Sequence, residues 1–189
     1  RIKQKVAQSG RQPRHARILP GIVPVIAETR AAAVEKKRHL DSLITVDSAL
    51  SFMSASMNHD LGRYPIDEPV PDIREMITGS KGRFNFVISQ ALEQKLTLGQ
   101  MALRYAESLS FPSPAGTADD IAAMMTEWYQ AGACDGFVIL PAYLETEGNL
   151  FLDEVVPRLQ RAGVFRNQYP GKTLRDTLGL NVPENPLFP

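Results

Sequence analysis

Two runs of apolar, mostly β-branched residues predict buried strands. The first run covers residues 18–26 (ILPGIVPVI) and the second covers residues 136–140 (GFVIL). Strands that are apolar on both faces are typical of parallel sheets in α/β proteins. Pro20 and Pro24 each remove a backbone donor from the first run, so we expect a bulge, a sheet margin or a strand end there. The pattern therefore predicts an α/β fold.

Helical spacing of apolar residues fills most of the remaining chain. We expect a first helix that ends at Gly10 and a second that begins after Thr29, extends toward Met57 and turns Leu40, Leu43 and Ile44 inward. Further helices are predicted over residues 84–92, 97–108, 117–131 and 150–162. The fourth of these six begins with the capping box Thr97–Gln100, and the last ends at Gly163. The order of helices and strands is that of a parallel sheet with crossover helices.

Proline and glycine mark the irregular parts of the chain. Residues 59–73 (HDLGRYPIDEPVPDI) contain three prolines and a glycine and predict a long loop. Loops of this length within a domain are usually functional or disordered. A weak strand is possible over residues 109–111, and the proline-rich tail 181–189 is expected to wrap the surface or to be disordered.

Composition excludes several classes of function. The 189 residues contain 21 Lys and Arg against 21 Asp and Glu, so the net charge is zero, which disfavours nucleic-acid binding and electrostatic membrane association. No apolar run approaches the roughly 18 residues of a membrane span. The single cysteine, Cys134, excludes an internal disulfide and fits a reducing, cytoplasmic location.

Candidate chemistry is sparse. His59 and Asp60 are neighbours in the long loop and could be a base with its partner, two metal ligands, substrate contacts or solvated loop residues. A metal site is disfavoured because no second ligand motif lies near them. We expect His15 and His39 to be exposed, and Cys134 to be a small buried residue rather than a nucleophile. The residues alone predict a scaffold with a functional loop and no self-sufficient active site.

The C-terminal half carries a resemblance to a known family. Residues 116–144 (GTADDIAAMMTEWYQAGACDGFVILPAYL) and 153–180 (DEVVPRLQRAGVFRNQYPGKTLRDTLGL) resemble the C-terminus of bacterial luciferase-like, flavin-dependent monooxygenases. The branch they resemble contains the nitrilotriacetate, pristinamycin and dibenzothiophene-sulfone monooxygenases. Residues 18–29 (ILPGIVPVIAET) and 59–72 (HDLGRYPIDEPVPD) agree as well, so the resemblance covers nearly the whole chain.

The resemblance implies a (β/α)8 TIM barrel and an enzyme that oxidises a small organic substrate with O2. In such enzymes reduced FMN (FMNH2) forms a flavin (hydro)peroxide, and a separate NAD(P)H:flavin reductase supplies the reduced flavin. The cofactor carries the oxygen chemistry, while the protein binds, orients and excludes water. The absence of a nucleophile or metal motif in the sequence agrees with this role.

The number of strands departs from a complete barrel. A full barrel takes roughly 250 residues, and this sequence predicts only two or three strands. We therefore expect residues 1–189 to be the C-terminal portion of a barrel, with residues 45–108 as a long helical and loop insertion or lid. The opening RIKQKVAQSGR has no initiator Met and favours a chain that starts inside a larger fold. The flavin-binding residues of the family would lie upstream, so none is assigned here.

Four residues are candidates for a substrate pocket or lid. Tyr143 follows the predicted strand 136–140, and active sites of such barrels lie at the carboxyl ends of the strands. His59, Asp60 and Tyr64 lie in the long loop that would cover the same face. Packing of the loop is an equally open interpretation for each.

Two hypotheses follow. In the first, the chain is part of an FMNH2-dependent monooxygenase that is active only together with its other portion. In the second, it is a non-catalytic truncated barrel that serves as an interaction or oligomerisation module; a third and weaker one is a small α/β binding domain. In every case apolar strand edges left without a neighbour predict association with another chain, such as a homo-oligomer.

Overall fold

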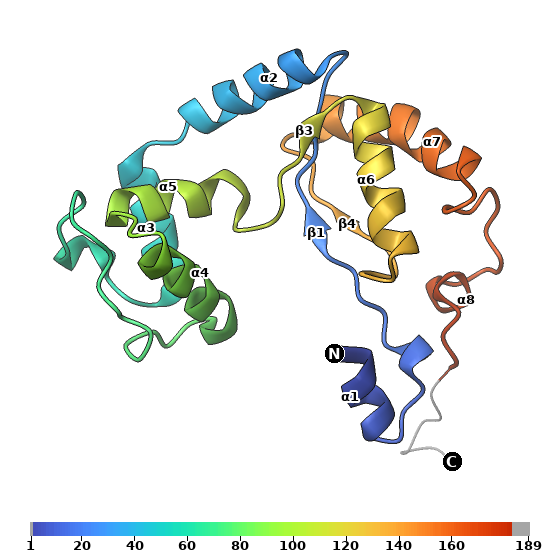
Figure 1. The fold of residues 1–189 in the computed structure, drawn as a ribbon, viewed down its shortest axis with the longest axis horizontal. Coiled ribbons are helices and arrows are strands. Elements are labelled where there is room, and N and C mark those ends of the chain that lie inside the picture. The colour runs from blue at the N-terminus through green and yellow to red at the C-terminus, as the bar shows by residue number, and fades with distance from the viewer. Residues whose placement is uncertain (1, 183–189) are drawn as a thin grey trace. The chain divides into compact units, whose positions relative to one another are not determined.

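The computed structural model describes residues 2–182, which divide between two units. The first, here called the terminal unit, consists of residues 2–21, 118–139 and 143–182. The second, called the central unit, consists of residues 22–117 and 140–142. The content is mixed α/β and mostly helical, with strands of two residues each (Figure 1).

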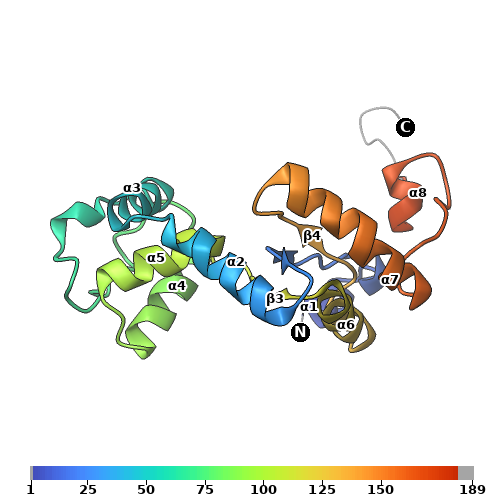
Figure 2. The same ribbon diagram turned by 90° about the horizontal axis from the view of Figure 1, so that it is seen from above.

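The terminal unit begins with a helix and a short turn and is completed by segments from the second half of the chain. Its elements are α1 (Ile2–Gln8), η1 (Pro13–His15), the first residue of β1 (Gly21–Ile22), α6 (Ala118–Gln130), β4 (Val138–Ile139), the π-helical turns η3 (Leu144–Gly148) and η4 (Phe151–Val155), α7 (Val156–Arg161) and α8 (Leu174–Leu178). Helices α6 and α7 pack against each other, as Figure 2 shows.

Strands β1 and β4 run parallel. The Asp135 N–H donates to the Ile18 carbonyl at 2.8 Å, and the Val138 N–H donates to the Pro20 carbonyl at 2.9 Å. The acceptors advance along the first segment as the donors advance along the second, which only a parallel pair allows. A parallel pair is joined by a crossover rather than a hairpin, and α6 lies within this crossover in the sequence.

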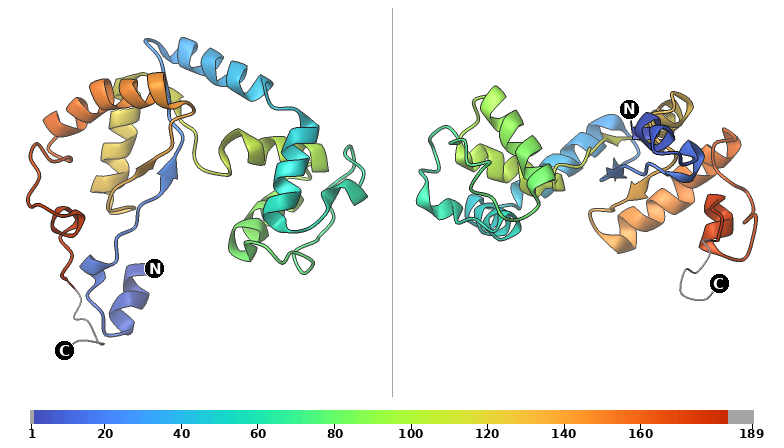
Figure 3. Two further views of the ribbon diagram at one scale, coloured as in Figure 1. Left: turned by 180° about the vertical axis from the view of Figure 1, so that it is seen from behind. Right: turned by 90° about the horizontal axis from the view of Figure 1, so that it is seen from below.

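The central unit holds four longer helices and one further strand pair. Its elements are β2 (Val25–Ile26), α2 (Arg30–Ser42), α3 (Val46–Met57), η2 (Leu61–Arg63), α4 (Lys81–Glu93), α5 (Leu98–Ser108) and β3 (Ala115–Gly116). Strands β2 and β3 pair in parallel, with Val25 opposite Ala115. Helices α3, α4 and α5 gather at one side of the unit, as both views of Figure 3 show.

A single apolar core joins α3, α4, α5 and the loop between α3 and α4. It contains sixteen buried residues: Ala49, Leu50, Met53, Met57, Leu61, Val70, Ile73, Ile77, Phe84, Val87, Ile88, Ala91, Leu98, Met101, Ala102 and Tyr105. The apolar residues of each helix recur at a spacing of three and four, so one face of each helix enters this core. The long loop contributes Leu61, Val70, Ile73 and Ile77, so it is packed rather than free.

Most helix boundaries predicted from the sequence are confirmed. Gly10 ends α1 with a positive φ of 75°, and Gly163 ends α7 with a φ of 70°. The Thr97–Gln100 capping box is present at the start of α5. These signals are local, so they do not depend on the tertiary fold.

Three predictions were wrong in detail. The helix predicted from residue 30 toward Met57 is two helices, because Thr45 caps a new one, and Leu43 between them is 65% exposed instead of inward-facing. Residues 109–111 are no strand, since Leu109 and Ser110 adopt left-handed φ values of 53° and 64°; the strand forms later, at Ala115. The buried strand predicted at residues 136–140 is only Val138–Ile139, and Val138 is 45% exposed. Residues 18–26, by contrast, form two short strands interrupted at Val23 and Pro24, which is the strand end expected at a proline.

The tail 181–189 was predicted to wrap the surface or to be disordered, and most of it lies outside the described residues. Within residues 2–182, no helix has both the length and the apolar character needed to cross a membrane.

Candidate functional site

The loop after α3 brings His59 and Tyr64 into contact. The Nε2 of His59 lies 3.0 Å from the Tyr64 hydroxyl, and the two rings stack with centroids 5.8 Å apart. The Tyr64 hydroxyl also donates to the sulfur of Met76 at 3.7 Å. His59 is half-buried. Since a histidine ring nitrogen and a tyrosine hydroxyl can each donate or accept, this pair presents two polar groups to whatever lies against the loop.

Asp60 has a different role in the same loop. Its Oδ1 accepts a hydrogen bond of 3.0 Å from the Gly62 N–H and so caps the short helix η2. Its Oδ2 lies 3.5 Å from Nε of Arg63, and both side chains are exposed. Asp60 therefore stabilises the turn that places Tyr64 beside His59. Neither of these two contacts of its carboxylate involves the His59 ring.

Tyr143 lies four residues after the last residue of β4 and directly precedes the π-helical turn η3. Its hydroxyl donates to Oε1 of Glu147 at 3.4 Å. Glu147 is 1% exposed and is the one buried charged side chain in residues 2–182. A buried carboxylate needs partners to offset its lost hydration, and π-helical turns are found frequently at functional sites.

The structure thus separates the predicted residues into two groups. His59, Asp60 and Tyr64 belong to the central unit and lie together, whereas Tyr143 belongs to the terminal unit and lies beside Glu147. Sequence reasoning missed Glu147, because a glutamate in an amphipathic segment gives no signal of burial. The position of Tyr143 after the strand predicted at residues 136–140 was the one sequence clue to this place.

A lysine side chain binds the backbone at the carboxyl end of β2. Lys36 on α2 donates from its Nζ to the Ile26 carbonyl at 2.7 Å. The Ala27 N–H donates to the Gly116 carbonyl at 3.2 Å, so β2 and β3 end side by side. The Lys36 ammonium and the ends of two parallel strands therefore lie close together in the central unit. The sequence analysis did not single out Lys36, because exposed lysines are common on helices.

Each unit also contains a hollow. The hollow of the terminal unit, about 510 Å³, lies between β4, α6 and α7 and is lined mainly by apolar side chains, with Arg17, Asp135 and Arg166 as its charged residues. The hollow of the central unit, about 400 Å³, lies between α4, α5 and the turn at residues 108–113. Neither is lined by His59, Tyr64 or Tyr143.

Asp135 joins the starts of the two strands in the terminal unit. Its Oδ2 accepts from the Ile18 N–H at 2.8 Å, its Oδ1 accepts from Lys3, and Arg17 lies 3.7 Å away. Burial of the carboxyl acts to raise its pKa, but the hydrogen bonds from Lys3 and Ile18 and the charge of Arg17 outweigh it, so the pKa lies below its usual value. These contacts hold the first segment against β4.

Other candidate chemistry is not assembled. Cys134 is buried, and burial raises the pKa of its thiol, as expected for a packing residue rather than a nucleophile. His39 is exposed and His15 is half-buried. Residues 2–182 contain no group of three or more His, Cys, Asp or Glu side chains arranged to hold a metal ion.

Comparison with known proteins gives relatives along almost the whole chain, although no family model matches it. The chain is 37% identical over 186 residues to dibenzothiophene-sulfone monooxygenase of Rhodococcus erythropolis, which covers 97% of this chain and 41% of that protein. It is also 37% identical over 185 residues to nitrilotriacetate monooxygenase component A of Aminobacter aminovorans, with coverage of 97% and 41%.

A solved structure agrees with these relatives. The structure of EDTA monooxygenase from Chelativorans sp. BNC1 matches with a TM-score of 0.57 and 30% identity, over 95% of this chain and 42% of that one. The chain therefore spans about two fifths of the length of the proteins it matches.

Proposed function

Because this chain belongs to the bacterial luciferase-like, flavin-dependent monooxygenases and corresponds to their C-terminal portion, we propose that it is part of an enzyme that uses FMNH2 and O2 to oxidise a small organic molecule. The observation that carries this proposal is the identity of more than a third to two named monooxygenases along 97% of the chain.

The proposed architecture is an arc of a (β/α)8 barrel. Its support is local: both strand pairs are parallel, β2 is followed by α2, and β3 is followed by α6. Parallel strands alternating with helices are the repeating unit of such a barrel. In this proposal residues 45–108, whose buried side chains form a core of their own, are an insertion that serves as a lid.

The described residues do not by themselves fit a flavin. Active sites of barrels lie at the carboxyl ends of the strands, but neither hollow is lined by residues that follow β2, β3 or β4, such as Glu28, Thr117 or Tyr143. We therefore propose that the flavin is bound mainly by the part of the protein that corresponds to the other three fifths of the relatives' length. No chemical step is assigned to residues of this chain.

Tyr143, His59, Asp60 and Tyr64 are proposed to line or cover the substrate. Tyr143 is supported by its position after β4 and its hydrogen bond to buried Glu147. His59 and Tyr64 are supported by their mutual contact, and Asp60 by its capping of the turn between them.

A separate reductase and a cytoplasmic location complete the proposal. The name of the nitrilotriacetate relative calls it component A, which supports a second component that supplies reduced flavin, namely an NAD(P)H:flavin reductase. A homo-oligomer is proposed because short parallel strands leave edges open to pairing.

The test uses the full-length protein that contains this chain, together with FMN, NADH and a flavin reductase. Dibenzothiophene sulfone and nitrilotriacetate serve as probe substrates, and incorporation of oxygen from ¹⁸O2 is measured by mass spectrometry. We expect incorporation that requires FMN, the reductase and O2. An anaerobic titration in which the full-length protein fails to bind FMNH2 would contradict the proposal.

Two further measurements locate the site. The 189-residue chain alone should bind FMN far more weakly than the full-length protein; tight, stoichiometric binding would contradict our placement of the flavin. His59→Gln and Tyr143→Phe should each lower kcat/KM about tenfold, a loss of ~1.4 kcal/mol, whereas His39→Gln, at an exposed position, should leave it unchanged.

A further inference from the structure

The hollow of the central unit is a formed pocket rather than a gap between loops. Its volume of about 400 Å³ lies in the range of small-molecule sites. One wall is aromatic: Phe86 of α4 is 59% exposed, and Phe111 follows the end of α5. The guanidinium of Arg83 lies 5.4 Å from the Phe111 ring centre, which holds this ring in place. An apolar ligand body could lie against these two rings.

A buried tyrosine lines the same pocket without a polar partner. Tyr105 of α5 is only 2% exposed, and its ring packs against Phe84 with centroids 5.3 Å apart. The Tyr105 hydroxyl has no hydrogen-bond partner within residues 2–182. Every fully enclosed side-chain nitrogen or oxygen in these residues does have a partner, so this hydroxyl is not fully enclosed. The hydroxyl must therefore reach accessible space, and the pocket is the hollow that Tyr105 lines. A hydroxyl in this position can donate a hydrogen bond to a ligand in the pocket.

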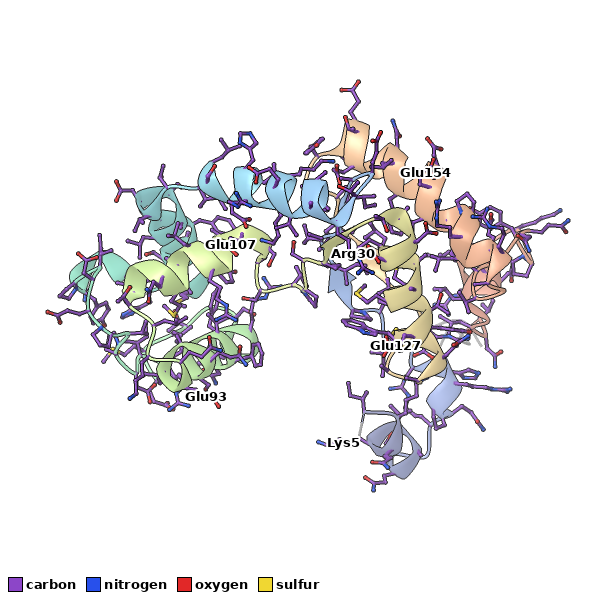
Figure 4. The ribbon with its side chains drawn as sticks, turned by 45° about the horizontal axis from the view of Figure 1, so that its top comes forward. Lys5, Arg30, Glu93, Glu107, Glu127 and Glu154 are labelled. Atoms are coloured by element: carbon purple, nitrogen blue, oxygen red, sulfur yellow. The ribbon has the colours of Figure 1, made fainter. Side chains whose placement is uncertain are left out.

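The pocket also contains an arginine that forms no ion pair with a carboxylate within residues 2–182. Lys37 is paired with Asp41 at 2.6 Å and lies 3.7 Å from Glu107, the α5 residue labelled in Figure 4. Arg104, by contrast, donates to the neutral side-chain amide of Gln94, and it forms no ion pair within residues 2–182. One guanidinium charge is thus available to a ligand, and guanidinium groups bind carboxylates and sulfonates in pairs of hydrogen bonds.

The turn that closes the pocket is held in an uncommon conformation. Leu109 and Ser110 both have left-handed φ values. The Ser108 hydroxyl donates to the Phe111 carbonyl at 2.7 Å, and the Phe111 N–H donates back to the Ser108 carbonyl at 2.9 Å. Backbone of this kind persists only where surrounding contacts fix it, and it is concentrated at ligand sites.

We propose that this pocket binds a small organic anion with an apolar or aromatic body. The anionic group lies between Arg104 and the Tyr105 hydroxyl, and the body lies against Phe86 and Phe111. This site is separate from the strand ends to which we assign the proposed oxidation, so it does not depend on that proposal.

The test measures binding of 1-naphthalenesulfonate to the full-length protein by isothermal titration calorimetry, with 1-naphthalenemethanol as the uncharged control of similar shape. We expect saturable binding of the sulfonate with one site per chain and binding of the alcohol at least about tenfold weaker, because the alcohol cannot pair with Arg104. Equal affinity for the two probes would overturn the proposal.

Binding measurements on variants then test whether the sulfonate occupies this pocket. Arg104→Gln should weaken sulfonate binding about tenfold, and Tyr105→Phe should weaken it about threefold while keeping the buried ring. Arg38→Gln is the matched control, since Arg38 is an exposed α2 arginine paired with Glu35. Circular dichroism of each variant checks the fold, and the comparison of the two probes stands even if one variant does not fold.

Two outcomes would overturn the assignment. The first is sulfonate binding that is unaffected by both Arg104→Gln and Tyr105→Phe, which would place the probe elsewhere. The second is displacement of the sulfonate by FMN in the wild-type protein, which would make this pocket part of the flavin site. Activity in the monooxygenase assay does not enter either criterion, so failure here is distinguishable from failure of the proposed function.

Discussion

The two units bury their apolar residues in different ways. In the central unit, residues 49–105 form one cluster of sixteen buried apolar side chains from a continuous stretch of chain. The terminal unit is assembled from three separated segments, and its buried apolar residues are fewer: Ile121, Ala122, Met125, Cys134, Phe151, Val155 and Leu159. It also contains the larger hollow, beside a two-residue strand. Stability that comes from apolar burial should therefore be concentrated in the central unit.

The largest expected effect concerns independent folding. A fragment of residues 44–110 contains α3, α4, α5 and all sixteen core residues, so we expect it to unfold cooperatively on its own. Thermal unfolding followed by circular dichroism tests this. A fragment that shows no cooperative transition would remove the proposed difference between the units.

Two phenylalanines sharpen the comparison. Phe84→Ala removes a ring that packs against Tyr105 in the central core, and we expect it to lower the free energy of unfolding by ~3–5 kcal/mol. Phe151→Ala should cost less, because Phe151 lines the hollow of the terminal unit, so part of its surface faces space rather than packed atoms. Urea unfolding, with hydrogen exchange to assign each unit, measures both. Equal costs would contradict the proposed difference in packing.

Two glycine substitutions, one at a crowded position and one at an open position, test how closely the chain packs where α3 ends. A Cβ on Gly79 would lie 2.5 Å from the Ser56 carbonyl oxygen, so Gly79→Ala should lower the free energy of unfolding by ~1–3 kcal/mol. Gly82, in the first turn of α4, has open space around it, and Gly82→Ala should raise the free energy of unfolding by ~0.5 kcal/mol through helix propensity. Chemical denaturation of both variants tests the prediction, and a loss at Gly82 as large as at Gly79 would count against it.

The smallest expected effect is electrostatic and belongs to the terminal unit. The pKa of Asp135 is lowered in the folded chain, so its contribution to stability is present above its unfolded pKa, near 3.8, and is lost as pH falls through the lower folded pKa. Because Lys3 and Arg17 are partly exposed, we expect Asp135→Asn to cost only about 1 kcal/mol at pH 7.

Urea unfolding between pH 2 and pH 7 checks this prediction. The variant should lose part of the pH dependence of the wild type below pH 4. Asp72→Asn is the control: its pKa is also lowered, through its hydrogen bond with Arg74, but both side chains are exposed and little change is expected. The same pH profile in Asp135→Asn and wild type would show that Asp135 does not hold the strands together.

Local sequence signals predicted the helices well and the strands poorly. Gly10, Thr97 and Gly163 act through hydrogen bonds or φ values of their immediate neighbours, so a short stretch of sequence carries the whole signal. The strand predicted at residues 109–111 was wrong, because strand formation depends on a partner. Here the partner, β2, pairs with residues 115–116 instead.

The candidate site shows the same division. The sequence singled out His59 and Tyr64 by their place in a proline-rich loop, and the structure adds the 3.0 Å contact between them. It could not single out Glu147, whose burial depends on the packing of the segments around it. Nor could it show the unpartnered Tyr105 hydroxyl, since an apolar helix face looks the same whether it faces a full core or a pocket.

By itself, the sequence determined where helices begin and end and which known proteins the chain is similar to, because capping residues and long matching motifs are properties of the order of residues. Only the tertiary structure decided which strands pair, which carboxylate is buried and that Arg104 forms no ion pair within residues 2–182. These depend on groups that are far apart in the chain, and their energies exist only once folding has brought those groups within a few ångströms of each other.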